Sequence, residues 1–388
     1  MNGGTTRAHE YGTSSPISDA EAVDLLRRMI ETGSVSGNEC AVAVLLSQEM
    51  SRRGFVSEVD AVGNAIGWRG PRDAEQVIVL LGHMDTVPGM IPVRIEGDLL
   101  FGRGSVDAKG PLATFVVAAS RAALPPNAAI VVIGAVEEET PTSRGARAVV
   151  DRFHPAACVI GEPSAGNGIT IGYKGRLVME YSVVRDLSHT AGPSVSAADE
   201  AFAFWQRVLT KINSLNQGRT GAFDTIQTTL RDLRTSSDGL AEQASLIAGF
   251  RLPPGLNPNG LQQMIALLAS TGQLDFLGHE SAHVSPRDNA VARHLAAAIR
   301  RGGERPVLRV KTGTSDMNVV APRWRCPIVA YGPGDSALDH TPNEHISLSE
   351  YLRAARVLTH TLETLASELG AEARRSADTD AQTRSLSK

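Results

Sequence analysis

Runs of apolar residues recur along the first half of this chain, and each of them stops abruptly at polar residues. Short runs of this kind, rich in Val and Ile, are typical of strands buried in a parallel sheet. Segments with apolar residues at helical spacing alternate with the runs, at 18–33, 37–54 and 109–123. This alternation predicts a layered α/β domain. The runs and their ends are 76–82 followed by His83 and Asp85, 129–136 followed by Glu137–Glu139, and 157–161 followed by Glu162.

The pattern changes near Gly172, where alternating apolar and polar residues at 175–184 predict a half-exposed strand. The segments that follow predict the order β-α-β-β-α-β, which suits a small antiparallel sheet with two helices on one face. A final helix at 347–368 begins at a capping box, Ser347-Leu-Ser-Glu350. The predicted segments between are a helix at 196–214, strands at 225–234 and 243–251, a helix at 257–270, a strand ending near His283 and a helix at 288–301.

The chain is therefore predicted to be one α/β domain interrupted by a smaller α+β domain of ferredoxin-like order, with a cleft between them. The two ends of the chain have no apolar periodicity and are predicted to be disordered. The predicted boundaries are 16–173 and 287–370 for the catalytic domain, 174–286 for the inserted domain, 1–15 for the N-terminus and 371–388 for the tail.

Composition narrows the class of protein. The 388 residues, 42% hydrophobic and 21% charged, are ordinary for a globular enzyme with a large core. A net charge of −4 gives no basic footprint for nucleic acid, and the apolar runs are too short to span a membrane. The N-terminus has no apolar signal core, and the three cysteines match no zinc or redox spacing. We therefore expect a cytoplasmic protein with free thiols.

The polar clusters that end the strands carry the candidate chemistry. Parallel strands place these clusters at one edge of the sheet, where the carboxylates would repel one another unless cations neutralised them. Every candidate ligand offers a nitrogen or an oxygen, a set that suits catalytic Zn²⁺, or Mn²⁺ or Co²⁺. Two such ions would polarise a carbonyl and acidify a water molecule, whose proton a free carboxylate would take. The candidate ligands are His83, Asp107, Glu139, Glu162 and His345.

Two further features support a site of this kind. Asp85 lies two residues after His83 and is placed to hold its imidazole by a hydrogen bond. The triplet Glu137–Glu139 can supply both a ligand and a base where the strand has turned into a loop. A Ser or Cys nucleophile finds no support, because the chain has no Gly-x-Ser-x-Gly elbow and no cysteine beside a candidate base.

Five motifs, in this order, resemble those of the dinuclear zinc amidohydrolases. That family includes acetylornithine deacetylase, succinyl-diaminopimelate desuccinylase, aminoacylases and glutamate carboxypeptidases. The resemblance covers residues 18–368 and implies a mixed sheet with helices on both faces, an inserted dimerisation or lid domain, and two divalent ions, most often Zn²⁺. The motifs are Gly82-His-Met-Asp-Thr86, Gly102-Arg-Gly-Ser-Val-Asp-Ala-Lys-Gly110, Glu137–Glu139, Gly161-Glu-Pro-Ser164 and His340-Thr-Pro-Asn-Glu-His345.

The resemblance implies a role for each candidate ligand. His340 is interpreted as a loop histidine and not as a ligand. The implied ligands are Asp107 as the bridge between the ions, His83 and Glu162 on one ion, and Glu139 and His345 on the other.

The same resemblance makes Glu138 the general base and has Asp85 orient the imidazole of His83. The family usually has Asp-Glu-Glu at the triplet, and the spacing from the triplet to Gly145 is one residue longer here. Glu137 as the base, with Glu138 as a ligand, therefore remains an alternative.

Two residues of the inserted domain match family positions. His189, in Ser188-His-Thr-Ala-Gly-Pro193, resembles a histidine that reaches across a dimer interface to stabilise an oxyanion. This match implies a homodimer. Arg251 resembles an arginine that could clamp a substrate carboxylate, and a salt bridge at a strand end is the alternative for it.

The subgroup that the chain resembles most is the amino-group-carrier hydrolases of lysine and arginine biosynthesis, on the segments 135–139, 168–177 and 311–318. These enzymes release lysine or ornithine from the C-terminal glutamate of a small acidic carrier protein. The analogy makes Lys174, Ser315 and Asn318 substrate contacts. A deacetylase, dipeptidase or carboxypeptidase of the same family is the alternative, as is an inactive relative that binds a partner. A basic rim that would attract the carrier is expected from Arg144, Arg147, Lys174 and Arg176.

Overall fold

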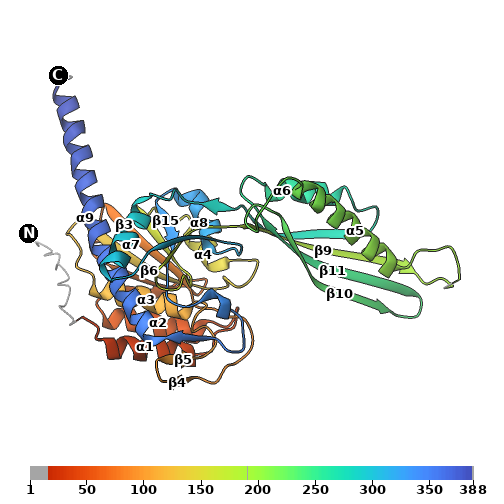
Figure 1. Ribbon diagram of the computed structural model, residues 1–388, viewed down its shortest axis with the longest axis horizontal. Helices are drawn as coiled ribbons and strands as arrows, with labels where there is room; N and C mark the ends of the chain where they lie inside the picture. Colours follow the sequence, from red (N-terminus) through yellow and green to blue (C-terminus); the bar gives the residue numbers. More distant parts are fainter. Residues whose placement is uncertain (1–15, 190, 387–388) are drawn as a thin grey trace, which may run out of the picture.

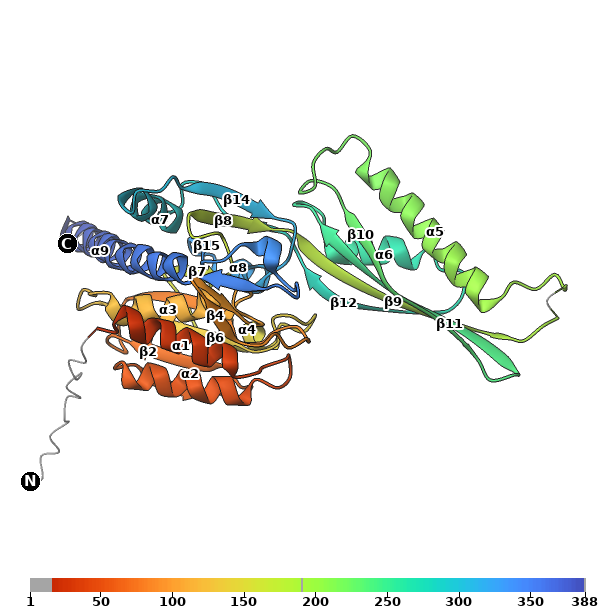
Figure 2. The same ribbon diagram turned by 60° about the horizontal axis from the view of Figure 1, so that its bottom comes forward.

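A computed structural model describes residues 16–189 and 191–386, with side chains described as far as residue 371. The predicted disordered N-terminus lies outside these residues. Figures 1 and 2 show a larger body of sheet and helices, from which a smaller body of sheet and helices extends to one side. Within the described ranges, no helix is both long enough and apolar enough to cross a membrane.

The larger body is built on a mixed sheet whose central strands run parallel. The strand β3 (Gln76–His83) pairs in parallel with β6 (Ala128–Ala135) on one side and with β7 (Ala157–Gly161) on the other. These three strands therefore end at the same edge. In order across the sheet, the strands are β1 (Val56–Val59), β2 (Ala65–Arg69), β6, β3, β7, β15 (Ile328–Ala330), β8 (Gly168–Tyr173) and β13 (His283–Val284), with β14 (Val307–Lys311) also paired to β8.

Helices cover both faces of this sheet because alternate strand residues are apolar on both sides. Ile78 and Leu80 face one core, and Val79 and Leu81 face the other. The first core is completed by α1 (Asp19–Glu31), α2 (Cys40–Arg52), α3 (Lys109–Arg121), α7 (Ala290–Arg301) and α9 (Leu348–Leu386), and the second by α4 (Arg144–Val149) and α8 (Asp316–Trp324). The predicted α/β class with helices on both faces is confirmed.

The smaller body has the predicted β-α-β-β-α-β order. Its four strands are all antiparallel, and both helices pack on one face of their sheet around Phe204 and Phe250. This strand order is the ferredoxin-like one expected from the sequence. The elements are β9 (Gly175–Asp186), α5 (Ala197–Asn216), β10 (Gln227–Ser237), β11 (Ala241–Leu252), α6 (Pro258–Ala266) and β12 (Gln273–Glu280), with the sheet order β10-β11-β9-β12.

The structure differs from the predicted organisation in three places. The strand β13 pairs with β8 of the larger sheet, so the smaller body ends before residue 283 and not at 286. The predicted tail from residue 371 continues α9 as far as Leu386, because this stretch contains no proline or glycine to stop a helix. Elements that the sequence did not predict include β8, α8 and a small sheet of β4 (Arg94–Glu96), β5 (Leu99–Phe101) and β16 (His345–Ser347).

Candidate metal centre

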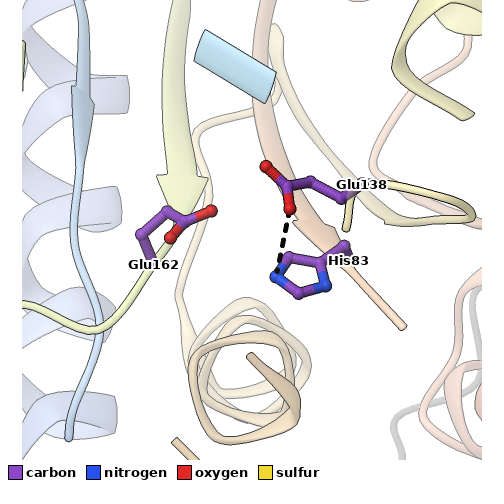
Figure 3. A group of neighbouring side chains, drawn as sticks. All are labelled: His83, Glu138 and Glu162. Carbon is purple, nitrogen blue, oxygen red and sulfur yellow. Dashed lines mark ion pairs between the residues drawn. The ribbon is translucent and has the colours of Figure 1, made fainter. Parts of the chain in front are cut away.

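Three of the predicted site segments meet where the central strands end. His83 is the last residue of β3, Glu138 follows β6, and Glu162 follows β7. Figure 3 shows the side chains of these three residues turned toward one another. Their convergence follows from the parallel pairing of the strands, which brings their carboxyl ends to one edge of the sheet.

The donor atoms form two overlapping groups that share His83. In one group, atoms of His83, Glu138 and Glu162 all lie within 4.8 Å of one another, and in the other those of His83, Asp107 and Glu139 do so. The Nε2 atom of His83 is 3.2 Å from Oδ1 of Asp107 and 4.0 Å from Oε2 of Glu138. Four of the five predicted ligands are therefore brought together.

The fifth predicted ligand, His345, is not brought to this group, and His340 takes its place. The Nε2 atom of His340 lies 3.0 Å from Oε1 of Glu139 and 3.1 Å from Oδ2 of Asp107. The Nδ1 atom of His345 instead contacts the Asn343 carbonyl at 2.6 Å. The interpretation of His340 as a loop histidine and of His345 as a ligand is corrected, because β16 holds His345 in the small sheet beside β5.

Of the acidic triplet, only Glu138 and Glu139 face the centre. Glu137 has a left-handed backbone (φ 56°), and its carboxylate accepts hydrogen bonds from Thr142 at 2.8 Å and Arg144 at 3.1 Å. These bonds hold the Glu137 carboxylate on the outer side of the loop. The geometry therefore disfavours the alternative in which Glu137 is the base.

Asp85 holds more of the site than the sequence suggested. Its backbone carbonyl lies 3.0 Å from Nδ1 of His83, and a carboxylate oxygen lies 3.4 Å from the same atom. Its carboxylate also accepts the backbone N–H groups of Glu138 and Glu139, both at 3.0 Å, and the hydroxyl of Ser36 at 2.7 Å. One buried carboxylate thus positions the imidazole and the acidic loop together.

Glu344 supports the other side of the site, and the sequence analysis missed it. Its fully buried carboxylate accepts the backbone N–H groups of Val106 at 2.9 Å and Asp107 at 3.1 Å. Arg103 donates to its other oxygen at 2.8 Å. The sequence signal for Glu344 is its position inside the motif at 340–345.

Burial and mutual repulsion shape the charges of the centre. Burial raises the pKa of Glu138 well above its usual range, and burial with nearby Asp107 raises the pKa of Glu162 to about 8. Burial would also raise the pKa of Asp107, but hydrogen bonds from His340 and His83 outweigh it and lower that pKa. Hydrogen bonds to Asp107 and Glu139 raise the pKa of His340 to about 10. Buried carboxylates that hold protons this strongly fit a site built for cations.

A cleft of about 600 Å³ opens over the centre between the two bodies. The end of the cleft beside the clustered carboxylates is acidic, and its other end carries cationic side chains from both bodies. Arg251, the predicted substrate clamp, lies in the wall, and its Nη1 donates to Thr314 at 2.6 Å. Arg231 also lies in the wall, and nothing in the sequence pattern of β10 set it apart. The cationic wall residues are Arg176, Arg231, Arg251 and Lys311.

Lys174 does not reach the cleft, contrary to the sequence prediction. The residue is fully buried between β8 and β9. Its Nζ donates to the carbonyl of Ala222 at 2.8 Å, to that of Thr225, and to the side chain of Gln227 at 3.2 Å. The loop at 222–225 folds over this ammonium group, so its role is structural.

Ser315 and Asn318 are likewise structural in this fold and are absent from the cleft wall. Together they form the capping box that begins α8. The Nδ2 atom of Asn318 also donates to the carbonyls of Lys174 at 3.2 Å and Ser281 at 2.8 Å. These carbonyls belong to the two segments that connect the larger and smaller bodies, so Asn318 ties both connections to α8.

The other three residues of the predicted basic rim are neutralised by partners. Arg144 pairs with Glu137, while Arg147 and Arg176 both pair with the buried carboxylate of Glu280. Opposite charges at these short distances reduce the field that reaches an approaching protein. The exposed cationic character of the cleft therefore rests more on Arg231 and Arg251 than on the predicted rim.

His189 is exposed in the loop between β9 and α5, away from the metal centre of its own chain. Figure 2 shows β9 running from the larger body toward the outer end of the smaller one. At about 3.3 Å per residue, a strand of this length carries the chain roughly 36 Å outward. His189 does not serve the centre of its own chain in this arrangement.

Comparisons with known proteins agree with the geometry. The chain matches the Peptidase family M20/M25/M40 over residues 79–364. It is 50% identical over 362 residues to LysW-lysine hydrolase of Deinococcus radiodurans, covering 90% of this chain and 99% of that protein. It is 41% identical over 353 residues to a putative LysW-lysine/LysW-ornithine hydrolase of Thermococcus kodakarensis, covering 90% and 93%.

A comparison of the fold with solved structures agrees with the family match. The crystal structure of an M20 family metallo-carboxypeptidase from Sulfolobus solfataricus matches with a TM-score of 0.74 at 16% identity, over 89% of this chain and 99% of that one. At this identity the match speaks for the fold alone. The chain therefore belongs to peptidase family M20/M25/M40 and is a metal-dependent hydrolase of amide or peptide bonds.

Proposed function

We propose that this protein releases lysine, ornithine or a related amino acid from the C-terminal glutamate of a small amino-group carrier protein by hydrolysing the amide between them. The observation that carries the proposal is the 50% identity to a LysW-lysine hydrolase, which extends over nearly the whole of that protein. The polar centre at one end of the cleft supports the same reaction class. The cytoplasm is the proposed compartment for such a biosynthetic step.

The residues present fit two divalent ions, with Zn²⁺ the first candidate and Co²⁺ or Mn²⁺ the others. Divalent ions held here would polarise the substrate carbonyl and acidify a water molecule. We assign His340, in place of His345, as a ligand because its imidazole reaches Glu139 and Asp107. The residues that would hold the ions are His83, Asp107, Glu139, Glu162 and His340.

Glu138 is the proposed general base. Its carboxylate lines the cleft beside His83, and burial raises its pKa well above the usual range. A carboxylate of raised basicity can take a proton from the attacking water and return it to the leaving amine. The backbone N–H of Glu138 is fixed by Asp85, so the base is held in place while it works.

The proposed clamp for the α-carboxylate of the released amino acid is Arg251, with Arg231 beside it in the cleft wall. An arginine can hold a carboxylate through two parallel hydrogen bonds. Arg251 is also anchored, because its guanidinium donates to Thr314 across the cleft.

A homodimer is part of the proposal, because His189 needs a second chain to act on. Its place beyond the outer end of β9 supports a role in the active site of a partner subunit. There an imidazole donor would stabilise the oxygen of the amide as it gains negative charge.

The test is a hydrolysis assay with added Zn²⁺ or Co²⁺. Purified enzyme is offered a carrier protein bearing lysine or ornithine on its terminal glutamate and, separately, N-acetylornithine, and release is followed by mass spectrometry. Cleavage of the conjugate is expected, and the mass names the amino acid. Cleavage of N-acetylornithine alone would replace the carrier hydrolase by a deacetylase.

A further inference from the structure

The hydroxyl of Tyr173 is an exception among the buried tyrosines of the described chain. Tyr173 is the last residue of β8, is only 2% exposed, and lines the cleft. Its hydroxyl oxygen is buried and has no hydrogen-bond partner among the described residues. The hydroxyls of Tyr181, Tyr331 and Tyr351 all donate to backbone carbonyls, at 2.8–3.1 Å. A buried donor left without an acceptor is destabilising, so the unpartnered hydroxyl needs an explanation.

The backbone and the ring of Tyr173 are fixed by their neighbours, whereas its hydroxyl makes no bond that holds it. Its backbone pairs with His283 of β13 and with Lys311 of β14. Its ring is part of the second core, to which Val320 and Ala330 also belong. The tyrosine is therefore a rigid donor whose position does not depend on any bond that the hydroxyl makes.

The surroundings of the hydroxyl identify the kind of acceptor that it suits. Burial raises the pKa of this hydroxyl well above the usual range, and the charges of Glu162 and Glu138 raise it further. The hydroxyl therefore keeps its proton at any working pH. Tyr173 lines the cleft, and the acceptor that hydrolysis brings to this region is the oxygen of the amide carbonyl.

We propose that Tyr173 is a catalytic residue whose hydroxyl donates a hydrogen bond to the carbonyl oxygen of the amide being cleaved. The bond strengthens as that oxygen becomes negatively charged, so it favours the transition state over the bound substrate. The tyrosine gives up no proton: water adds to the carbonyl carbon, the C–N bond breaks, and the amine leaves with a proton that Glu138 returns. The role rests on the proposed amide hydrolysis and not on the identity of the amino acid.

The deciding variant is Tyr173→Phe, which removes the hydroxyl and keeps the ring. We expect kcat to fall roughly 10²-fold, as for the loss of one oxyanion donor, with little change in KM. We also expect no fall in Tm, because no hydrogen bond of the folded protein is lost. The matched control is Tyr351→Phe, whose hydroxyl donates to the carbonyl of Ala22 far from the cleft. That variant should lower Tm and leave kcat unchanged.

Two results would overturn the proposal. An unchanged kcat would show that the hydroxyl does not act on the reacting oxygen. A raised KM with an unchanged kcat would place its contact elsewhere on the substrate. The comparison uses whichever amide the wild-type enzyme cleaves, the carrier conjugate or N-acetylornithine. Failure of the conjugate would therefore remove the proposed substrate and leave the test of Tyr173 intact.

Discussion

Four carboxyl groups, from Asp107, Glu138, Glu139 and Glu162, share one small volume with the imidazoles of His83 and His340. Two imidazoles, even when both are protonated, do not balance four carboxylates. Burial raises the pKa values of three of the four acids, Glu138, Glu139 and Glu162, and so favours their uncharged forms. At the scale of residues, the site would therefore release protons when it binds cations.

The role of each acid in the triplet can be separated by substitution. Glu138→Ala should keep its bound metal and lose turnover by several orders of magnitude, because the base is removed and the ligands are not. Metal content is measured by mass spectrometry and turnover by amine release. Glu137→Ala is the matched control, since its carboxylate binds Thr142 and Arg144 outside the centre. If the Glu138→Ala variant kept wild-type turnover, the role of base would pass to Glu137.

The two histidines of the last motif make a second matched pair. His340→Ala should reduce the metal bound per chain, because its imidazole lies against Glu139 and Asp107. His345→Ala should leave the metal content unchanged, because its imidazole contacts the carbonyl of Asn343. Metal titration of both variants after chelation measures the difference. The reverse result would restore the sequence-based assignment of His345.

Sequence could predict which residue types gather here but not every residue that reaches the centre. His83 and Glu162 follow apolar strands whose ends are plain in the sequence. His340 lies in a loop with a left-handed backbone (φ 61°), and its direction depends on contacts that residue spacing does not encode. The burial of Lys174 is unpredictable for a similar reason, because a loop distant in sequence covers its ammonium group.

At the scale of elements, α1 and α2 are joined by a buried ion-pair cluster centred on Glu49. This side chain is 2% exposed and binds Arg28 at 2.9 Å, Arg52 at 2.6 Å and also Arg53. Burial alone would raise its pKa, but the hydrogen bonds from Arg28 and Arg53 outweigh burial and lower it below its ordinary value of 4.5. The cluster therefore stabilises the fold only while Glu49 is ionised.

Glu49→Gln should lower the free energy of unfolding by about 3 kcal/mol at pH 7, since it breaks a buried pair. A depressed folded-state pKa contributes stability above the unfolded value, and that contribution is lost as the pH falls. The gap between the variant and the wild type should therefore narrow below about pH 4.5. Denaturant unfolding at several pH values measures it. A gap that stayed constant with pH would mean that the charge of Glu49 contributes nothing.

The sequence predicted long elements better than short ones. The 13-residue helices and the buried strands have enough periodic positions to be recognised. The helix α8 has nine residues with Pro322 inside, and β4, β5 and β16 have three residues each. Elements this short are decided by the partners they pair with, which lie far away in the sequence.

At the scale of the whole molecule, the smaller body carries His189 away from the centre that its own chain builds. In a symmetric dimer, each chain would contribute His189 to the active site of the other chain, so that neither active site is complete in a single chain. The proposal therefore predicts that activity depends on association.

Mixing two inactive variants tests this directly. The His189→Ala variant lacks the residue contributed to the partner's site, and the Glu138→Ala variant lacks the base. A hybrid dimer would contain one complete site, built on the chain that keeps Glu138. After unfolding and refolding together in equal amounts, the mixture should recover about a quarter of wild-type activity, because half of the dimers are hybrid. If activity does not return although hybrids are detected, His189 acts within its own chain or has no catalytic role.

The two segments that connect the bodies, at Lys174 and Ser281, are both held by Asn318. The Nδ2 atom of Asn318 holds a carbonyl on each, and the strands run so close that a Cβ atom on Gly175 would lie 2.3 Å from the carbonyl oxygen of Glu280. These contacts hold the two connections against each other, so the width of the cleft between the bodies depends on a pair of segments that Asn318 keeps together.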